Sequence, residues 1–366
     1  MYLNTSPTPD QPGRWVVSAF GGPSVLEWKP CSFDRELAPQ EVLVRILAAG
    51  IAGSDNMQRV GGYPDPRCAE PGFTTGYDCV GEVVSLGSSA TALGVLHPGD
   101  RVATLCVLGA HATHIILPAS ELIPIDATAD PVKIAALPLN YMTAWGMLKR
   151  SGVDLPPGST ILIGSVSGGV GTAVAQLVHA FDLQLNMIGT CSPSKFEYVR
   201  SLGVTPVDRN APDLVAQIKS LTNGLGVDVA YDAVGSEDSL MKSYQATKEN
   251  TGQVRAIGVM SEVKKDGSGL QEREINIAQI FAARLQPRSD FFMVTLHYYD
   301  KDRSRFIKDF LAIVEKVQSG VLNPNISRLL LLRDAVEAHK SLVSGKDIMG
   351  KMVFIVDSAL AKEHSL

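Results

Sequence analysis

The feature that most limits the fold is an apolar run that ends at a glycine-rich turn and continues into an uncharged helical pattern. The run covers 161–163, the turn 164–171 and the helical pattern 172–178. Glycines permit a tight turn and let a pyrophosphate approach the backbone, where the N–H groups of the next helix face the anion. The pattern therefore predicts a dinucleotide site formed by Ser167, Gly168, Gly169, Val170 and Gly171. The competing interpretation is an ordinary strand-to-helix turn whose glycines serve packing.

Length and charge narrow the class of protein. The 366-residue chain is long for a single core, so two domains are expected. A hydrophobic content of 45%, with 19% charged residues, is typical of a globular protein. The net charge of −5 argues against a nucleic-acid partner, because no basic excess would offset phosphate repulsion. The uncharged segment 160–181 is as long as a membrane span, but the dinucleotide turn accounts for its central glycines, so no membrane helix is expected.

The five cysteines contain no C-x-x-C pair. This spacing predicts reduced thiols in an intracellular protein rather than a disulfide framework or a metal site. The segment 1–14 is polar and contains prolines, without the apolar core of a secretory signal. A cytoplasmic location is therefore expected.

Two kinds of pattern divide the chain. The first third carries short β-like runs separated by Gly, Pro and Asp, which predicts an antiparallel β domain; the runs are 42–47, 79–84 and 101–105. From about Pro131, helices alternate with buried strands, which predicts a parallel sheet covered on both faces. The predicted helices are 135–150, 195–202, 211–221 and 304–319, and the predicted strands are 185–190, 227–232, 252–258 and 291–296. A last strand, 351–356, is expected to return to the first domain.

A set of short motifs occurs in a fixed order: GIAGSD at 50–55, RVGGYP at 59–64, PGDRV at 98–102, LP at 137–138, TAW at 143–145, SGGVG at 167–171, GVD at 226–228 and GK at 350–351. This set resembles the medium-chain dehydrogenase/reductase superfamily, and more narrowly its quinone oxidoreductase and enoyl reductase branch. The resemblance covers nearly the whole chain. It implies an α/β protein with a Rossmann-type doubly wound parallel sheet domain, 129–299, and a GroES-like antiparallel β domain, 1–128 and 300–366.

Many members of this superfamily use zinc to polarise an alcohol or carbonyl oxygen. Such a site needs three protein ligands, and the resemblance puts their positions at Ala52, Tyr77 and Leu139. A methyl, a phenol and an isobutyl group do not hold catalytic zinc, and the four-cysteine lobe that binds structural zinc is missing as well. His111 and His114 have no third partner in the sequence and are expected to be structural or exposed. No metal is therefore expected.

The end of the second strand of the parallel sheet indicates which cofactor is bound. An NAD site carries an acidic residue there, roughly twenty residues past the glycines, which binds the ribose 2′-hydroxyl. Here the position falls near Thr190 and no carboxylate follows, whereas Ser192 can donate a hydrogen bond and Lys195 a positive charge to a 2′-phosphate. Arg209, after the next strand, is a second candidate cation. Because NADP(H)-dependent relatives show a similar Ser and Lys, NADP(H) is the expected cofactor, although exposed surface residues explain the two cations as well.

The resemblance also implies which residues lie near the nicotinamide. Those expected to line or approach it are Thr143, Gly258, Val259 and Lys351. The chain departs from the family pattern at two positions. Val166 stands where relatives have Gly or Ala and is expected to shift the pyrophosphate, and Ala52 stands where zinc-free relatives often carry Asn.

Hydride addition to an activated alkene is the chemistry that needs least from a zinc-free protein. NADPH would deliver hydride to the β-carbon of an enone, quinone or enoyl thioester, and the developing enolate needs a hydrogen-bond donor and then a proton. Tyrosine hydroxyls can meet both needs, and the candidates are Tyr63, Tyr77 and Tyr141. The competing interpretation for each of them is packing.

The expected function is therefore NADPH-dependent reduction of an activated C=C bond in a small-molecule or carrier-bound unsaturated carbonyl substrate. Two alternatives remain: a redox-silent pathway enzyme such as a cyclase, and a non-catalytic NADPH-binding protein. The segment 290–296 is expected at the sheet edge, where similar proteins pair two subunits. This favours a homodimer, with a monomer as the alternative.

Overall fold

The computed structural model describes residues 11–272 and 275–366, and it divides into two compact units. Unit 1 comprises the chain up to Leu139 together with Lys264–Gln271 and Ile326–Leu366. Unit 2 comprises Asn140–Val263 and Glu272–Asn325. The segments that lie in a different unit from the domain to which the sequence assigned them are 129–139, 264–271 and 300–325.

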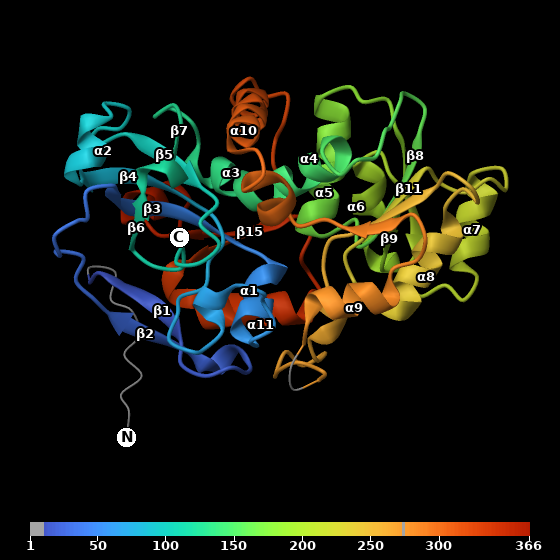
Figure 1. Cartoon of the computed structure of the whole chain (residues 1–366), viewed down its shortest axis with the longest axis horizontal. Helices are drawn as coiled ribbons and strands as arrows, with labels where there is room; N and C mark the ends of the chain where they lie inside the picture. The colour runs from blue at the N-terminus through green and yellow to red at the C-terminus, as the bar shows by residue number, and fades with distance from the viewer. Residues whose placement is uncertain (1–10, 273–274) are drawn as a thin grey trace. The chain divides into compact units, whose positions relative to one another are not determined.

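Unit 2 contains a parallel sheet (Figure 1). In the described chain its six strands follow the order β10-β9-β8-β11-β12-β13, and every neighbouring pair is parallel. Counted from β8, this is the strand order of a Rossmann-type doubly wound sheet, which confirms the predicted fold class. The strands are β8 (Thr160–Ile163), β9 (Asn186–Cys191), β10 (Thr205–Asp208), β11 (Val229–Asp232), β12 (Gln253–Ala256) and β13 (Ser289–Phe291).

Helices connect these strands and cover the sheet. Strands buried on both faces have continuous apolar runs, and all four residues of β11 are buried. The helix α4 packs on α5, and α7 packs on α8. None of the helices in the described ranges is both long and apolar enough to cross a membrane. The helices of unit 2 are α4 (Met142–Lys149), α5 (Gly169–Ala180), α6 (Phe196–Ser201), α7 (Leu214–Leu221), α8 (Glu237–Ala246), α9 (Ile277–Arg284) and α10 (Arg303–Gln318).

Unit 1 contains a largely antiparallel sheet. Within the described residues its seven strands follow the order β14-β15-β3-β4-β5-β7, and β6 pairs with β3. The strands are β3 (Glu41–Ile51), β4 (Cys79–Leu86), β5 (Arg101–Thr104), β6 (His114–Pro118), β7 (Ile123–Pro124), β14 (Ile326–Leu331) and β15 (Lys351–Ile355), with β1 (Gly13–Val17) and β2 (Leu26–Pro30) forming a separate antiparallel pair. The helices are α1 (Gly53–Arg59), α2 (Ser88–Ala92), α3 (Pro131–Ala135), α11 (Ala335–Ser344) and α12 (Ser358–Glu363).

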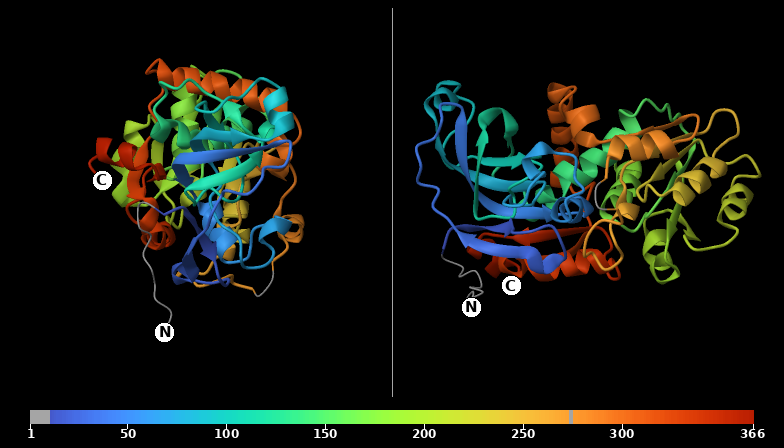
Figure 2. Two further views of the ribbon diagram at one scale, coloured as in Figure 1. Left: turned by 90° about the vertical axis from the view of Figure 1, so that its left-hand side faces the viewer. Right: turned by 60° about the horizontal axis from the view of Figure 1, so that its bottom comes forward.

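The strand β15 closes unit 1. It pairs antiparallel with β3, with Met352 opposite Ile51, and all five of its residues are buried. Figure 2 shows this C-terminal part of the chain beside strands from the N-terminal part. The prediction that the strand near 351–356 returns to the first domain is confirmed, because its uninterrupted apolar run suits a strand inside the sheet.

The predicted helix 135–150 is divided into three pieces. The helix α3 ends at Ala135, a π-helical turn follows at Leu137–Tyr141, and α4 begins at Met142. Helical spacing of apolar residues continues through all three pieces, which is why the sequence pattern does not separate them. Irregular turns of this kind are frequent at functional sites.

The predicted strand 291–296 is wrong beyond its first residue. The strand β13 ends at Phe291, and Thr295–Tyr299 forms a π-helical turn. The aromatic and branched residues of this segment have high β propensity, but tertiary packing overrides it. Tyr298 and Tyr299 are buried with their rings against Phe306, which a helical turn permits and an alternating strand would not.

The glycine-rich turn after β8 packs tightly against the sheet. The N–H of Val166 donates to the Thr190 carbonyl at 3.1 Å, and the Val166 side chain is fully buried. A Cβ at Gly189 would lie 2.7 Å from the Val166 side chain, and one at Gly171 would lie 2.6 Å from Val166 Cα. The Val166 side chain therefore packs underneath the turn against β9, and its expected shift of the pyrophosphate stays a prediction.

Gly189→Ala is expected to destabilise the fold by about 1–3 kcal/mol, because the added methyl would lie 2.7 Å from the Val166 side chain. Val166→Ala in the same chain removes the two Cγ atoms that lie 2.7 and 2.9 Å from that methyl but keeps Cβ, so the double variant should recover part of the loss. Urea denaturation of both single variants and the double variant measures the free energy of unfolding. Strictly additive losses would contradict this packing.

Candidate functional site

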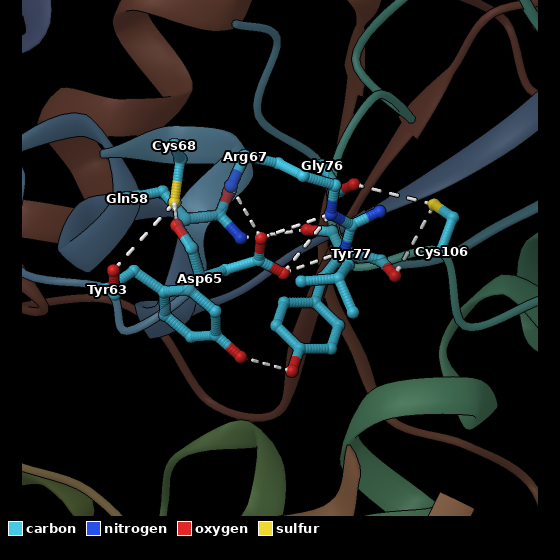
Figure 3. Close-up of polar contacts among 9 residues, drawn as sticks. Gln58, Tyr63, Asp65, Arg67, Cys68, Gly76, Tyr77 and Cys106 are labelled. Atoms are coloured by element: carbon cyan, nitrogen blue, oxygen red, sulfur yellow. Dashed lines mark hydrogen bonds and ion pairs between the residues drawn. The ribbon is translucent and has the colours of Figure 1, made fainter. Parts of the chain in front are cut away.

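The hydroxyl groups of Tyr63 and Tyr77 form a short hydrogen bond in unit 1 (Figure 3). Their rings meet edge to face, with centroids 5.8 Å apart and an interplanar angle of 82°. Tyr77 is buried and Tyr63 is half-buried. Burial, together with the neighbouring Tyr77, raises the pKa of Tyr63 well above its ordinary value. Tyr63 therefore stays protonated at neutral pH and can donate a hydrogen bond.

The loop after α1 positions Tyr63. The Asp65 N–H donates to the Tyr63 carbonyl at 2.9 Å, which closes a turn around Pro64. Asp65 then caps a short helical turn by accepting from the Arg67 N–H at 2.8 Å, and the Arg67 guanidinium pairs with the same carboxylate at 2.8 Å. The proline and the capping aspartate thus give the sequence its local reasons to turn here.

A buried ion pair lies next to Tyr77. Lys351 Nζ lies 3.3 Å from both carboxylate oxygens of Asp78, and the two side chains are 2% and 0% exposed. The Leu139 N–H donates to Asp78 Oδ2 at 3.0 Å. A Cβ at Gly50 would lie 2.0 Å from Asp78 Oδ1, so only glycine leaves room for the pair. Sequence reasoning placed Lys351 near the cofactor and missed this partner; the cofactor contact stays a prediction.

The three positions that hold zinc in zinc-dependent relatives carry other interactions here. The Ala52 N–H donates to Asp55 Oδ2 at 2.7 Å, Tyr77 bonds to Tyr63, and the Leu139 backbone binds Asp78. These side chains provide no nitrogen, thiolate or carboxylate donor, so they do not fit catalytic zinc. In the part of the chain that the structure describes, no group of three or more His, Cys, Asp or Glu residues could hold a metal ion.

His111 and His114, the two histidines considered above as possible metal ligands, form hydrogen bonds with other groups of unit 1. His111 is fully buried, with Nδ1 2.8 Å from Thr75 Oγ1 and Nε2 3.0 Å from the Gly50 carbonyl. His114 Nδ1 lies 3.1 Å from Thr113 Oγ1. Both histidines therefore take part in the hydrogen bonding of the fold.

In unit 2 the glycine turn leads into α5, with Gly168 as the residue before the first helical turn. The N–H groups of Gly169, Val170 and Gly171 begin the helix, where backbone donors have no partner within the helix itself. The first helical residue whose N–H has such a partner is Thr172, which donates to the Gly168 carbonyl at 2.9 Å. With Ser167 just before them, these donors fit an anionic group such as a pyrophosphate.

The structure brings Ser192, Lys195 and Arg209 together at the end of β9. The Lys195 N–H donates to the Ser192 carbonyl at 2.9 Å, and the Arg209 N–H donates to the Cys191 carbonyl at 3.0 Å. Burial raises the pKa of the Cys191 thiol, while the charges of Lys195 and Arg209 lower it. Lys195 and Arg209 therefore lie close to Cys191, at a strand end that also carries the Asp208 carboxylate.

Tyr141 and Thr143 lie at the start of α4. Tyr141 is buried, and its hydroxyl donates to Gln176 Oε1. Burial raises the pKa of Tyr141. This is the environment of a packing residue, and the role of Tyr141 as a proton donor stays a prediction. Thr143 is buried two residues further along the same segment.

The loop after β12 holds Gly258 and Val259, and the loop after β11 holds Gly235. A Cβ at Gly235 would lie 2.4 Å from the Gly258 carbonyl oxygen, so the two loops approach closely. Asp232 Oδ1 accepts from the N–H groups of Val234 and Gly235, at 2.9 and 2.7 Å. Sequence reasoning missed Asp232, although an aspartate at the end of a buried strand and before a glycine is a recognisable signal.

Arg284 joins the same two loops. Its guanidinium donates to the Gly235 carbonyl at 2.9 Å and to Glu262 Oε1 at 2.7 Å. Because Glu262 is buried in the turn after β12, the pair holds this turn against the loop after β11. No sequence signal pointed to Arg284, since α9, where it lies, is separated from both loops along the chain.

The two halves of the chain match separate family descriptions. Residues 38–127 match the alcohol dehydrogenase GroES-like domain, and residues 169–296 match the zinc-binding dehydrogenase family. A 2-haloacrylate reductase from a Burkholderia species is 29% identical over 346 residues, which cover 93% of this chain and 98% of that protein. A quinone oxidoreductase of Pseudomonas aeruginosa is 34% identical over 227 residues, 61% of this chain and 67% of that protein.

A solved structure gives the same result. The quinone oxidoreductase of Pseudomonas syringae pv. Tomato superposes with a TM-score of 0.77 at 28% identity, covering 94% of this chain and 99% of that one. The chain therefore belongs to the medium-chain dehydrogenase/reductase superfamily, in its quinone oxidoreductase and enoyl reductase branch. It is an oxidoreductase.

Lys351→Met is expected to destabilise the fold by about 3–5 kcal/mol at neutral pH, because it leaves the Asp78 carboxylate buried and unpaired. Burial already raises the pKa of Asp78, and Lys351 opposes that rise. A carboxyl whose pKa is higher in the folded than in the unfolded state favours folding at low pH, and this contribution is lost as pH rises. Urea denaturation should therefore give a smaller loss at about pH 5 than at neutral pH.

The control is the double variant Lys351→Met with Asp78→Asn, which removes both charges. Its free energy of unfolding should change little between about pH 5 and neutral pH through this site. A loss of the same size at both pH values in the single variant would show that Asp78 is not the titrating group.

Proposed function

We propose that this chain is an NADPH-dependent, zinc-independent reductase of an activated C=C bond. The observation that carries the proposal is the hydrogen bond between Tyr63 and Tyr77, since the resemblance gives Tyr77 the position of a histidine ligand in zinc-dependent relatives. A phenol pair suits a reaction that needs a proton at a developing enolate rather than a Lewis acid at an alcohol.

The residues of unit 2 fit a nicotinamide dinucleotide with a 2′-phosphate. The glycine turn presents the donors of α5 without an intervening side chain, because Val166 packs underneath. Ser192, Lys195 and Arg209 offer a hydroxyl and two positive charges at the end of β9, where an NAD site would carry a carboxylate. The loops with Gly258 and Val259, together with Thr143, are proposed to line the nicotinamide, and Lys351 to approach it.

NADPH bound here would supply a hydride for the β-carbon of the substrate. The Tyr63–Tyr77 pair would donate a hydrogen bond to the carbonyl oxygen as negative charge develops there, and then a proton to the enolate. The hydrogen bond that joins the hydroxyls would let one phenol pass its proton to the other, and a proton from solvent would then restore the pair. Acid catalysis of this kind contributes about 100-fold to 10,000-fold to a rate.

The proposed substrate is an unsaturated carbonyl compound, either a small molecule or an acyl chain on a carrier. The names of the 2-haloacrylate reductase and of the quinone oxidoreductase both describe substrates with a C=C bond conjugated to a carboxyl or carbonyl group. The chain is further proposed to form a homodimer through the edge of the parallel sheet, where β13 is the last strand and Leu296 is exposed.

The purified protein is expected to oxidise NADPH in the presence of at least one of menadione, methyl vinyl ketone, chloroacrylate and crotonyl-coenzyme A. Tyr63→Phe should lower kcat by about 100-fold with little change in the KM for NADPH, because it removes the phenol proton and keeps the ring. Tyr244→Phe, which removes a phenol on α8, is the matched control and should leave the rate unchanged. If none of the four compounds is reduced, the redox-silent or non-catalytic alternative replaces this proposal.

Lys195→Ala is expected to weaken NADPH binding by about tenfold or more while NADH binding changes little, because only NADPH carries the phosphate that Lys195 would contact. Calorimetric titration of the wild type and the variant with both cofactors measures the two affinities. Lys219→Ala, on the surface of α7, serves as the charge control. An equal loss for NADH would contradict the assignment of this strand end to the 2′-phosphate.

A further inference from the structure

A strained γ-turn lies beside Tyr77. The Leu108 N–H donates to the Cys106 carbonyl at 2.8 Å, and the residue between them, Val107, has a φ of 69°. Three-residue turns with a positive φ are rare and strained, and the left-handed region is especially unfavourable for a β-branched residue. Such a conformation persists only where neighbouring groups hold it in place.

Gln58 holds this turn. It lies on α1 with its side chain fully buried, and its Nε2 donates to the Val107 carbonyl at 2.8 Å. Among the described residues its Oε1 has no hydrogen-bond partner, although that atom is buried. Burial of a half-satisfied amide is unfavourable, and an apolar side chain of similar size would avoid that cost. The hydrogen bond between Gln58 and Val107 therefore joins a strained backbone conformation to a buried amide with an unsatisfied oxygen.

The γ-turn in turn fixes the backbone of Tyr77. The Val107 N–H donates to the Tyr77 carbonyl at 3.0 Å, and the Cys106 thiol lies 3.6 Å from the same oxygen. Figure 3 shows Gln58 and Cys106 together with the two tyrosines. The helix α1 is therefore connected to both tyrosines. Gln58, within the helix, binds the turn that contacts the Tyr77 carbonyl, and the loop that follows the helix carries Tyr63.

We propose that Gln58 is a positioning residue for the Tyr63–Tyr77 pair. Its hydrogen bond keeps Val107 in the left-handed conformation, and that conformation keeps the Val107 N–H on the Tyr77 carbonyl. The inference rests on the proposed function, in which the pair supplies the proton. A strained residue and an unsatisfied buried amide beside the backbone of Tyr77 fit the pattern of sites where local stability is lost in favour of function.

A double-mutant cycle tests this coupling. Glycine adopts a φ of 69° without a Cβ clash, so Val107→Gly removes the need for Gln58 to hold the turn. Gln58→Met should lower kcat for methyl vinyl ketone by about 100-fold in the wild-type chain, with the KM for NADPH within about twofold. The same substitution in the Val107→Gly chain should lower kcat by about threefold or less.

Hydrogen exchange gives a readout that does not depend on activity. Gln58→Met should speed exchange of the Val107 amide by about tenfold or more, because its bond to Tyr77 is released. Exchange should slow again when Val107→Gly is added. Matched controls are Gln217→Met, which removes another glutamine hydrogen bond, and Gln184→Gly, which relieves another positive φ, here 53°. Neither control should change kcat or exchange at residue 107.

The outcomes separate the two proposals. If Gln58→Met lowers kcat and speeds exchange to the same extent in both backgrounds, the positioning role is overturned. If exchange follows the expected pattern but Tyr63→Phe leaves kcat unchanged, Gln58 still fixes the turn and the proposed role of the tyrosine pair is wrong. If exchange at residue 107 does not respond to Gln58→Met, the inference fails whatever the kinetics.

Discussion

The arrangement of unit 1 depends on one buried carboxylate. Asp78 has no contact with solvent, so its charge must be balanced inside the protein, and Lys351 balances it from a strand 273 residues further along the chain. The pair requires glycine at position 50 and orients the backbone of Leu139. Through these contacts, β3, β4, β15 and the segment before α4 meet at one point. In zinc-dependent relatives a metal ion provides the positive charge near this place; here an ammonium group lies beside the carboxylate next to Tyr77.

The replacement of the zinc ligands of relatives by other side chains is consistent with the proposed reduction of an activated C=C bond. A reductase of an activated alkene needs a hydride donor and a proton donor, and the two needs fall on different units of the chain. Unit 2 carries the glycine turn and the cationic end of β9, both suited to a dinucleotide phosphate. Unit 1 carries the hydrogen-bonded phenols. Burial disfavours the phenolate of Tyr63, so this hydroxyl keeps its proton at neutral pH.

Two residues with a positive φ lie beside Tyr77. Gly76 has a φ of 107°, and a Cβ there would lie 2.4 Å from the backbone nitrogen of His111, so the residue before Tyr77 must be glycine. Val107, on the other side of the Tyr77 carbonyl, has a conformation that valine avoids. Elsewhere in this part of unit 1, residues 41–46 of β3 alternate between partly buried and buried, as expected for a strand with one face on the core. The difference separates a scaffold that sequence propensity favours from a site whose geometry is imposed by its surroundings.

The sequence by itself determined the features that depend on neighbouring residues. The apolar run, the glycines and the uncharged helical pattern fixed the turn after β8, and the absence of a carboxylate after β9 was visible without coordinates. The apolar run of β15 also identified a buried strand. Only the tertiary structure decided which distant side chains meet: Asp78 with Lys351, and Gln58 with Val107, 49 residues apart. The end of the predicted strand 291–296 belongs to a π-helical turn in the structure, because burial of Tyr298 and Tyr299 outweighs local β propensity. Backbone propensity acts over a few residues, whereas these pairings depend on how whole elements pack.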